Sequence, residues 1–314
     1  MYDAIIIGGG PAGVAAGIYA ARKRLKTALI AEEVGGQSVV SSRIENWIGT
    51  PALSGADLGK ALQEHLEAVS DTNGKDSSLT LALGERVTSL ERITEGFSAK
   101  TKSGKEFRAK AALIATGASH RKLEIPGADR FEHKGVTYCA SCDGPVFAGQ
   151  DVAVIGGGNA GFDAAAQLLA YAKSVTLLHR RSEFKADPSP VEKVLAHPNM
   201  RVITNAEPAE ILGDQFVSGL RYRDTKAGDM RDLTVAGVFV EIGTVPNTGF
   251  LSDLLELSPS GHIIIQDRRR QTTSQEGLWA AGDATDELYH QNNIAAGDGA
   301  KAMEDLYLWV KKNA

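Results

Sequence analysis

Residues 4–13 read Ala4-Ile5-Ile6-Ile7-Gly8-Gly9-Gly10-Pro11-Ala12-Gly13, an unbroken apolar run followed directly by a glycine-rich turn. Such a run is typical of a parallel strand that is buried on both faces. The glycines allow a tight turn, and the first backbone amides of the helix that follows can then approach a pyrophosphate. Small residues recur on one face of that helix, at Ala12, Ala15, Ala16, Ala20 and Ala21. The stretch predicts the start of a dinucleotide-binding unit.

A second predicted strand, Thr27 to Ile30, ends shortly before Glu32. An acidic residue at this place in the unit can accept hydrogen bonds from an adenosine ribose, so Glu32 is the candidate. A lone glycine motif is weak, and an ordinary tight strand–helix turn is the alternative reading. The ordered succession of strand, glycines, small-residue helix, strand and acid favours a dinucleotide site.

The same pattern occurs a second time, with a strand over Asp151–Ile155, glycines over Gly156–Gly161, a helix over Phe162–Tyr171 and a strand over Ser174–Leu178. The second strand ends here in cations instead of an acid: His179, Arg180 and Arg181, with Lys185 shortly after. Cations at this position can meet a ribose 2′-phosphate and favour NADP over NAD. The alternative is that they are solvated surface charges. Gly156, Gly158, Asn159 and Ala160 are the matching candidates for contact with the phosphates.

The two cysteines of the chain, Cys139 and Cys142, lie between the two glycine motifs and are separated by two residues. Two thiols at this spacing can close into a small reducible disulfide. Zinc is an alternative, but a zinc site asks for four ligands, and the sequence offers no second pair of cysteines or histidines. Two buried inert thiols are the other alternative. The exposed turn predicted at Asp143 and Gly144 favours the reducible disulfide.

Composition sets the broad class of the protein. A chain of 314 residues suggests two domains, and its net charge of −5 gives no reason to expect nucleic acid or an anionic membrane as a partner. We expect a cytoplasmic location, because no leader and no bilayer-length apolar run is seen. The basic runs Arg268–Arg270 and Lys311–Lys312 are interpreted as solvated surface.

Several further stretches predict strands or hairpins. They are Leu79–Arg92, Phe97–Phe107 with a turn at Gly104, Ala111–Gly117, Val217–Asp224 and Val235–Ile242. The polar run of residues 70–78 predicts a surface loop. Residues 277–283 predict a strand that ends in Gly282 and Asp283, where the aspartate can accept hydrogen bonds from cofactor hydroxyls. A turn without a ligand is the alternative there.

Taken together, these motifs resemble the low-molecular-weight thioredoxin reductases and, equally, the flavoprotein subunit of alkyl hydroperoxide reductase without its extra N-terminal domain. The resemblance covers nearly the whole chain. Its landmarks are Gly8–Gly13, Gly35-Gly36-Gln37, Glu45-Asn46, Ala115-Thr116-Gly117, Cys139–Gly144, Gly156–Gly161, His179–Arg181, Gly243–Thr248, Gly282-Asp283 and Tyr289-His290-Gln291.

The resemblance implies an α/β fold of two Rossmann-like FAD/NAD(P)-binding domains, the class II pyridine nucleotide-disulfide oxidoreductase fold, with the second domain inserted in the first. Residues 1–116 and 245–314 would form a discontinuous FAD-binding domain. Residues 117–244 would form the NAD(P)H-binding domain that carries the cysteines. A homodimer is also implied.

The resemblance also assigns residues to roles. Cys142 would face the flavin, Cys139 would attack the disulfide of the partner, and Asp143 would serve the thiols as an acid–base group, although a turn or helix-cap role is its alternative. The residues it places around FAD are Gly8, Gly10, Pro11, Ala12, Gly13, Gly36, Gln37, Asn46, Val87, Thr116, Gly117, Gly282, Asp283 and Gln291.

Three functions follow as hypotheses. The first is an NADPH-dependent reductase, with NADH as another donor, that reduces a thioredoxin-like or glutaredoxin-like protein. The second keeps the flavin and the cysteines but takes electrons from ferredoxin or oxidises small dithiols. It is motivated by Ala160, Asp163 and Lys185, which depart from the family pattern. The third is a redox-responsive dinucleotide-binding module without catalysis.

Overall fold

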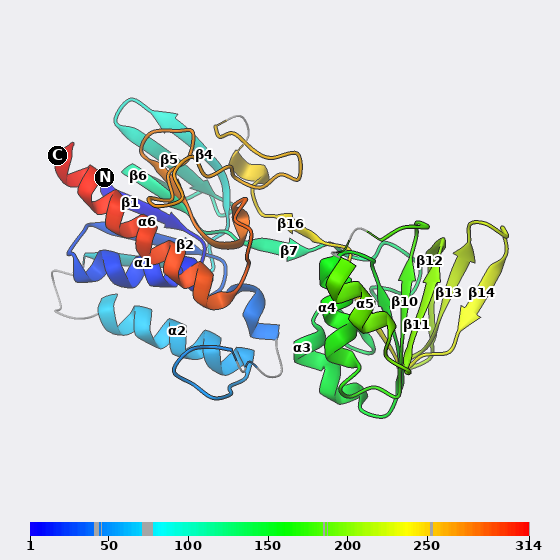
Figure 1. Ribbon diagram of the computed structural model, residues 1–314. Coiled ribbons are helices and arrows are strands. Elements are labelled where there is room, and N and C mark those ends of the chain that lie inside the picture. The colour runs from blue at the N-terminus through cyan, green and yellow to red at the C-terminus, as the bar shows by residue number, and fades with distance from the viewer. Residues whose placement is uncertain are drawn as a thin grey trace. The chain divides into compact units, whose positions relative to one another are not determined.

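The computed structural model describes residues 1–40, 44, 46–70, 78–184, 186, 188–251 and 254–313, with the backbone alone for residues 40, 141, 142, 189 and 190. The chain forms two compact units. The terminal unit consists of Met1–Ser119 and Val245–Ala314, and the central unit consists of His120–Thr244. The chain passes between them in β7 (Ala118–His120) and β16 (Thr244–Pro246), which pair as a two-stranded sheet (Figure 1).

A seven-stranded sheet forms the middle of the terminal unit, in the order β3-β2-β1-β6-β5-β4, with β17 also paired to β6. Strands β3, β2, β1, β6 and β17 run parallel, whereas β5 and β4 continue the sheet antiparallel. The first half of β6 pairs with β5 and its last residues pair with β17. The strands are β1 (Tyr2–Ile7), β2 (Thr27–Ala31), β3 (Leu79–Leu83), β4 (Val87–Ile93), β5 (Gly96–Thr101), β6 (Glu106–Ile114) and β17 (Leu278–Ala280).

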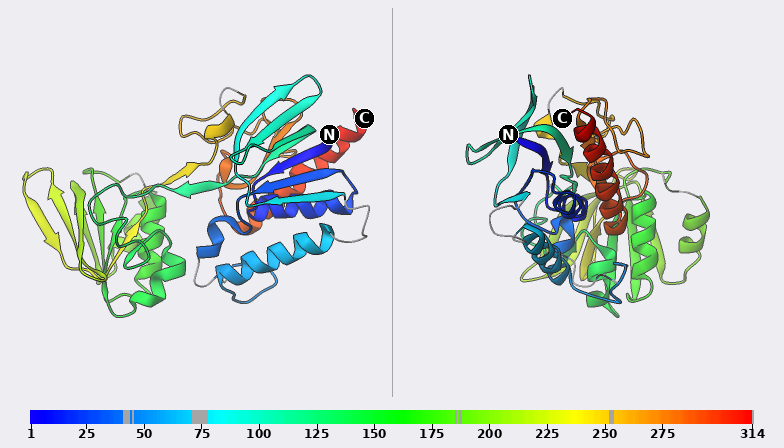
Figure 2. Two further views of the ribbon diagram at one scale, coloured as in Figure 1. Left: turned by 180° about the vertical axis from the view of Figure 1, so that it is seen from behind. Right: turned by 90° about the vertical axis from the view of Figure 1, so that its left-hand side faces the viewer.

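Apolar residues of β1 are buried on both faces of this sheet, as the unbroken run predicts. Ala4 and Ile6 belong to the core beneath the helices, and Ile5 and Ile7 belong to the core of the opposite face. Helices α1 (Pro11–Arg22), α2 (Gly55–Ser70) and α6 (Asn292–Lys312) contribute to the first core. Figure 2 shows α6 in red beside α1 in blue.

The small residues of α1 allow this helix to pack closely against both the sheet and α6. Ala12, Ala16 and Ala20 are buried in the core that α1 shares with the sheet and with α6. A Cβ on Gly299 of α6 would lie 2.0 Å from the carbonyl oxygen of Ala12, so only glycine allows the two helices to approach this closely. The predicted small-residue face is therefore used for close packing.

The central unit contains a five-stranded parallel sheet in the order β11-β10-β9-β15-β8. One face packs with α3, α4 and α5, and the other packs with the three-stranded sheet β12-β13-β14. The parallel strands are β8 (Val136–Thr137), β9 (Asp151–Ile155), β10 (Ser174–His179), β11 (Met200–Thr204) and β15 (Gly237–Val240). The other elements are α3 (Ala140–Asp143), α4 (Asn159–Leu168), α5 (Pro188–Leu195), β12 (Ala206–Gly213), β13 (Val217–Asp224) and β14 (Met230–Leu233). The predicted architecture of two Rossmann-like domains, the second inserted in the first, is confirmed.

Short 3-10 helices complete the chain: η1 (Gly36–Val40), η2 (Gly144–Phe147), η3 (Gly249–Leu251) and η4 (Gly282–Ala284). Some predicted boundaries shift. Helix α4 begins at Asn159 and ends at Leu168, because the glycine turn leads directly into the helix. Strand β15 is shorter than the predicted Val235–Ile242.

The stretch Leu79–Arg92 separates into two strands that pair with different neighbours, β3 with β2 and β4 with β5. Residues 71–77 of the predicted surface loop lie outside the described residues, and Ser70 ends α2. None of the described helices is long and apolar enough to cross a membrane.

Candidate active site

The first glycine turn forms a tight junction between β1 and α1. Gly8 has a φ of +119°, and a Cβ there would lie 2.1 Å from the carbonyl oxygen of Ala115. A Cβ on Gly13 would lie 1.9 Å from the carbonyl oxygen of Gly8. Gly10, the N-cap of α1, differs because a Cβ there would meet nothing within 4 Å. Gly8 and Gly13 thus close the turn, and Gly10 leaves the start of α1 open to a ligand.

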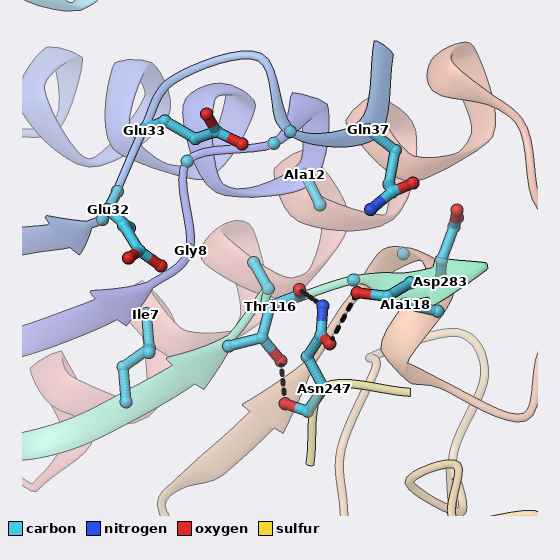
Figure 3. A pocket seen from close by; sticks show the side chains of 18 of the residues that line it. Ile7, Gly8, Ala12, Glu32, Glu33, Gln37, Thr116, Ala118, Asn247 and Asp283 are labelled. Atoms are coloured by element: carbon cyan, nitrogen blue, oxygen red, sulfur yellow. Dashed lines mark hydrogen bonds between the residues drawn. The ribbon is translucent and has the colours of Figure 1, made fainter. Parts of the chain in front are cut away.

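A cavity of about 680 Å³ adjoins this turn, and all the residues that line it belong to the terminal unit (Figure 3). Its volume is that of a small-molecule or cofactor site, roughly 300–1,000 Å³. Most of the residues predicted to contact FAD line it: Gly8, Gly10, Pro11, Ala12, Glu32, Gly36, Gln37, Val87, Thr116, Gly117, Gly282 and Asp283. The fold therefore gathers separate segments of the sequence around one cavity.

Three of the predicted residues lie outside this lining. Gly13 packs against Gly8 within the turn. Asn46 donates a hydrogen bond from Nδ2 to Oε1 of Gln291 at 3.0 Å, and its carbonyl oxygen accepts one from Nδ2 of Asn293 at 2.6 Å. These bonds join the loop after η1 to the start of α6, where Asn292 lines the cavity.

Asn247 is a cavity residue that the sequence analysis does not single out. Its Nδ2 donates to the carbonyl oxygen of Thr116 at 2.9 Å, and its own carbonyl oxygen accepts from the Thr116 hydroxyl at 2.8 Å. Its Oδ1 accepts from the Ser119 hydroxyl at 3.0 Å. Figure 3 shows these bonds bridging two segments of the cavity wall. The only sequence signal was the Gly243–Thr248 landmark that contains Asn247.

Glu32 stands at the end of β2 on the cavity wall, where the sequence predicts the ribose-binding acid. Its Oε2 lies 3.6 Å from Nη1 of Arg86, which also lines the cavity. Both side chains are more than half exposed, so this ion pair contributes little to stability. The Glu32 carboxylate therefore stays accessible to ribose hydroxyls.

Asp283 lies in the short helix η4 on the opposite wall of the cavity. Gly282 has a φ of +72°, and a Cβ there would lie 3.2 Å from the Cβ atoms of both Ala12 and Ala295. A glycine at position 282 tolerates this positive φ and leaves room for Ala12 and Ala295, so η4 can pack closely against the first turn of α1. Its position fixes Asp283 beside the glycine turn.

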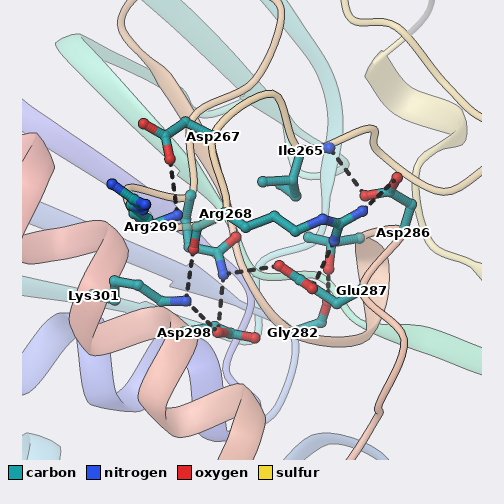
Figure 4. Close-up of polar contacts among 11 residues, drawn as sticks. Ile265, Asp267, Arg268, Arg269, Gly282, Asp286, Glu287, Asp298 and Lys301 are labelled. Carbon is teal, nitrogen blue, oxygen red and sulfur yellow. Dashed lines mark hydrogen bonds and ion pairs between the residues drawn. The ribbon is translucent and has the colours of Figure 1, made fainter.

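A polar network fastens the chain that follows η4 (Figure 4). The Arg268 guanidinium lies 2.6 Å from a carboxylate oxygen of Glu287 and 3.2 Å from one of Asp286. Nε2 of the fully buried Gln271 donates to Oδ1 of Asp298 at 2.9 Å, and Lys301 lies 3.1 Å from the same oxygen. The network ties the segment after η4 to α6.

Arg268, Arg269 and Arg270 are all exposed, as the sequence predicts, and two of them also form ion pairs. Arg268 pairs with Asp286 and Glu287, and Nε of Arg270 lies 2.7 Å from Asp305 of α6. The acidic partners are distant in sequence, so the basic run by itself does not predict these ion pairs.

The residues that line the terminal cavity match the groups of a dinucleotide that carries a flavin. Its wall combines the open helix start at Gly10, the accessible acid Glu32 and the polar groups Gln37, Asn247 and Asp283. A pyrophosphate needs the first feature and a ribose the second. The residues present therefore fit such a cofactor.

The substitution Gly10→Ala is expected to weaken flavin binding while destabilising the apoprotein only modestly. The added methyl meets no protein atom within 4 Å, and alanine in place of glycine at a helix N-cap costs about 1 kcal/mol, whereas the methyl group projects where the ligand must approach. Flavin retention and urea unfolding of the apoprotein measure the two effects. Gly297→Ala is the matched control, because Gly297 also meets nothing within 4 Å but does not line the cavity. Equal flavin affinity in both variants would contradict the assignment of Gly10.

The second glycine turn repeats the geometry of the first. Gly156 has a φ of +131°, and a Cβ there would lie 2.1 Å from the carbonyl oxygen of Glu241. A Cβ on Gly161 would lie 2.0 Å from the carbonyl oxygen of Gly156. Gly158, the N-cap of α4, is open in the same way as Gly10. Asn159 and Ala160 form the first turn of α4, so the candidates for phosphate contact surround one helix start.

The residues at the end of β10 have different environments. The His179 ring is buried, its Nε2 lies 2.8 Å from the carbonyl oxygen of Glu183, and it packs beneath Gly157. The side chains of Arg180 and Arg181 are exposed. Lys185 lies outside the described residues. Of the basic residues that the structure describes at this strand end, Arg180 and Arg181 are therefore the ones whose side chains are exposed and can bind the phosphate of a ligand.

Cys139 is disulfide-bonded and caps the short helix α3. The one other cysteine of the sequence, Cys142, has its backbone in α3, and its side chain lies outside the described part of the chain. The Cys139 backbone amide donates to the Thr137 hydroxyl at 3.3 Å, and that hydroxyl donates to the Asp143 carboxylate. Thr137 thus connects the two candidate groups, a role that the sequence does not predict. Within the described residues, no group of three or more His, Cys, Asp or Glu side chains could hold a metal ion.

Glu241 is a mostly buried carboxyl beside the second glycine turn. Burial raises its pKa to about 8, and the nearby negative charge of Asp163 adds to the effect. The carboxyl is therefore neutral at pH 7 in the folded protein and ionised at that pH in the unfolded chain.

A raised pKa makes stability depend on pH. The contribution of Glu241 is fully present below its ordinary pKa of 4.5 and is lost as pH rises toward about 8. We expect the free energy of unfolding of the wild type to fall by on the order of 2 kcal/mol between about pH 6 and pH 8.5. Glu241→Gln should remove that part of the fall. Urea unfolding at both pH values measures it, and an equal fall in the variant would contradict the burial of this carboxyl.

Comparison with known proteins places the chain in a family. Residues 2–300 match the family described as pyridine nucleotide-disulphide oxidoreductase. The chain is 39% identical over 312 residues to a Bacillus subtilis protein named NADH dehydrogenase, a match that covers 99% of this chain and 59% of that protein. It is 38% identical over 312 residues to a Staphylococcus epidermidis protein named as a subunit of alkyl hydroperoxide reductase, a match that covers 99% of this chain and 60% of that protein. The chain thus spans about three fifths of the length of these curated relatives.

Solved structures with the same fold match over the full length. Thioredoxin reductase from Lactococcus lactis has a TM-score of 0.77 at 34% identity, with 99% of this chain and 100% of that chain covered. Thioredoxin reductase from Streptococcus pyogenes has a TM-score of 0.80 at 34% identity, with 99% of each chain covered.

These matches confirm the class II oxidoreductase fold and the predicted resemblance. The chain belongs to the pyridine nucleotide-disulphide oxidoreductase family. It is an oxidoreductase of the flavoprotein type, and membership implies binding of a flavin and of a nicotinamide nucleotide. Its structural neighbours are low-molecular-weight thioredoxin reductases.

Proposed function

We propose that this chain is a flavin-dependent disulfide reductase that passes electrons from NADPH, through FAD and the Cys139/Cys142 pair, to a thioredoxin-like or glutaredoxin-like protein. The observation that carries the proposal is the combination of two glycine turns of the same geometry with a disulfide-bonded Cys139 next to Asp143. Two such turns suit two dinucleotides, and a reducible disulfide gives the electrons an exit.

The terminal unit is assigned to FAD. The first turn of α1 would hold the pyrophosphate, Glu32 the adenosine ribose, and Gln37 and Asp283 the flavin end of the cofactor. The chemistry that a bound FAD supplies is hydride uptake from a nicotinamide and two-electron reduction of a disulfide. The protein residues bind and orient it, and Asn247 supports the cavity wall through Thr116.

The central unit is assigned to NADPH. The first turn of α4, with Asn159 and Ala160, would meet the pyrophosphate of the nucleotide. The exposed guanidinium groups of Arg180 and Arg181 would bind the 2′-phosphate through charge-assisted hydrogen bonds. Buried His179 supports the glycine turn from below instead of meeting the ligand.

The cysteines carry out thiol–disulfide exchange. In the reduced protein, the Cys139 thiolate attacks one sulfur of the disulfide of the partner, and a mixed disulfide forms as the other sulfur leaves as a thiolate. Asp143 serves as the acid–base group for these proton transfers, and Thr137 orients its carboxylate. Cys142 then attacks the Cys139 sulfur, which restores the internal disulfide and releases the second thiol of the partner.

Oxidation of NADPH in the presence of purified disulfide proteins tests the proposal. We expect turnover with an oxidised thioredoxin-like or glutaredoxin-like protein, and one partner thiol pair released for each NADPH consumed. Turnover with no disulfide protein, while small dithiols are oxidised or reduced ferredoxin feeds the flavin, would contradict it. The relative named NADH dehydrogenase favours NADH as a second donor, so each assay is run with both nucleotides.

A further inference from the structure

Glu241 stands at the nucleotide-binding edge of the central sheet. It directly follows β15, and β15 lies beside β9 on the side opposite to β10. The strand order therefore reverses between β9 and β15. In open parallel sheets, ligands bind at the carboxyl ends of the strands at this reversal.

The backbone of Glu241 abuts the second glycine turn. Its amide donates to the carbonyl oxygen of Ile155 at 2.8 Å, which continues the pairing of β15 with β9. A Cβ on Gly156 would lie 2.1 Å from the Glu241 carbonyl oxygen and 3.5 Å from the Glu241 Cβ. The residue is thus part of the wall on which the turn rests.

The side chain of Glu241 points to the face of the sheet that α3 and α4 cover. Phe239, two residues earlier, belongs to the core cluster that also contains Phe162 of α4 and Ala140 of α3, and side chains two residues apart in a strand share a face. The first turn of α4 and the glycine turn, where a pyrophosphate would lie, are on the same side.

The charged groups facing Glu241 offer it no cation. Asp163 of α4 adds negative charge. On α3, the Asp143 carboxylate accepts the Thr137 hydroxyl and Cys139 is in a disulfide. The glycine turn and residues 242–244 carry no titratable side chain. Among the residues that the structure describes, no positive charge acts on the Glu241 carboxyl to hold it ionised.

We propose that Glu241 makes nucleotide binding proton-dependent: its neutral carboxyl admits the diphosphate of a nicotinamide dinucleotide at the Gly156–Gly161 turn, and its carboxylate opposes it. This inference rests on the assignment of the nicotinamide nucleotide to the central unit. Like charges in a partly desolvated site repel each other strongly. The pKa of about 8 leaves the carboxyl neutral at pH 7, so binding weakens as pH rises above that value.

Calorimetric titration of the oxidised holoprotein with NAD⁺ and, separately, NADP⁺ at about pH 7 and about pH 9.5 tests the inference. Oxidised nucleotides leave the flavin and the disulfide unchanged, and NAD⁺ has no phosphate that titrates in this range. The variants are Glu241→Gln and Glu241→Ala. The control is Asp214→Asn, which removes a carboxyl of the same unit whose side chain is 99% exposed.

The expected result is an about tenfold increase in the Kd of the wild type for NAD⁺ at the higher pH, on the order of one screened charge repulsion. Both Glu241 variants should show a Kd that barely changes with pH, and Asp214→Asn should follow the wild type. The same pH dependence in Glu241→Gln and in the wild type would overturn the role of Glu241. Absence of binding by the wild type to either nucleotide at both pH values would instead overturn the assignment of the central unit.

Discussion

The substitution Cys139→Ser is expected to reduce protein-disulfide turnover to the uncatalysed background, while FAD stays bound and is still reduced by the nicotinamide nucleotide. A serine hydroxyl cannot act as the attacking thiolate, and exchange requires one. The flavin cavity is lined by the terminal unit alone, whereas Cys139 belongs to the central unit, so the cavity keeps its residues in the variant. Stopped-flow reduction of the flavin and steady-state turnover with a disulfide protein measure the two effects.

Cys142→Ser is the matched variant, because it removes the other thiol of the pair. It should still attack the partner but cannot resolve the product, so a covalent mixed disulfide with the partner should accumulate. Cys139→Ser should give no such adduct. An adduct that forms in Cys139→Ser instead would mean that the two roles are reversed, and loss of flavin reduction in either variant would mean that the cysteines also serve the nucleotide step.

The double substitution Arg180→Ala, Arg181→Ala is expected to raise the KM for NADPH far more than the KM for NADH. Each lost charge-assisted hydrogen bond to the 2′-phosphate is worth roughly 1.5–3 kcal/mol, which is at least about tenfold in affinity for each arginine. NADH has no such phosphate, so its KM should change by no more than about twofold. Steady-state kinetics with both nucleotides measure the selectivity.

Arg201→Ala is the control for loss of a positive charge, because Arg201 is an exposed arginine of the same sheet that lies near the start of β11, away from the carboxyl ends of the strands. It should leave both KM values near those of the wild type. Equal increases for NADPH and NADH in the double variant would show that Arg180 and Arg181 do not recognise the 2′-phosphate.

Much of the fold could be predicted from the sequence because local signals agree with long-range packing. The apolar run of residues 4–7 is followed by a glycine turn whose glycines the structure requires at Gly8 and Gly13. The repeated motif at Gly156 and Gly161 has the same steric requirement. Both strands therefore lie where their residue patterns indicate, and both helices start within the glycine motifs, at Pro11 and Asn159.

The pairing partners of strands could not be predicted in the same way. Leu79–Arg92 has the composition of a hairpin, yet β3 extends the parallel part of the sheet and β4 pairs with β5. Strand pairing depends on which edge of the sheet is available after the helices have packed. The amino-acid sequence of one segment does not reveal which edge that is.

Some residues of the candidate site were also missed. Asn247 bonds Thr116 across 131 positions of the sequence. Thr137 bonds groups only two and six positions away, but its place between the Cys139 amide and the Asp143 carboxylate depends on the local backbone path, which the sequence did not reveal. The sequence could not show the burial of Glu241, since a glutamate after a strand is more often exposed.

Anaerobic titration of the purified yellow protein with NADPH, and separately with NADH, tests the central claim most directly. The claim is that electrons enter from a nicotinamide nucleotide at the Gly156 turn and reach the flavin of the terminal unit. We predict that NADPH bleaches the visible flavin absorbance rapidly and at stoichiometric amounts, with NADH needed at higher concentration. A flavin that dithionite reduces but neither nucleotide reduces would contradict the claim.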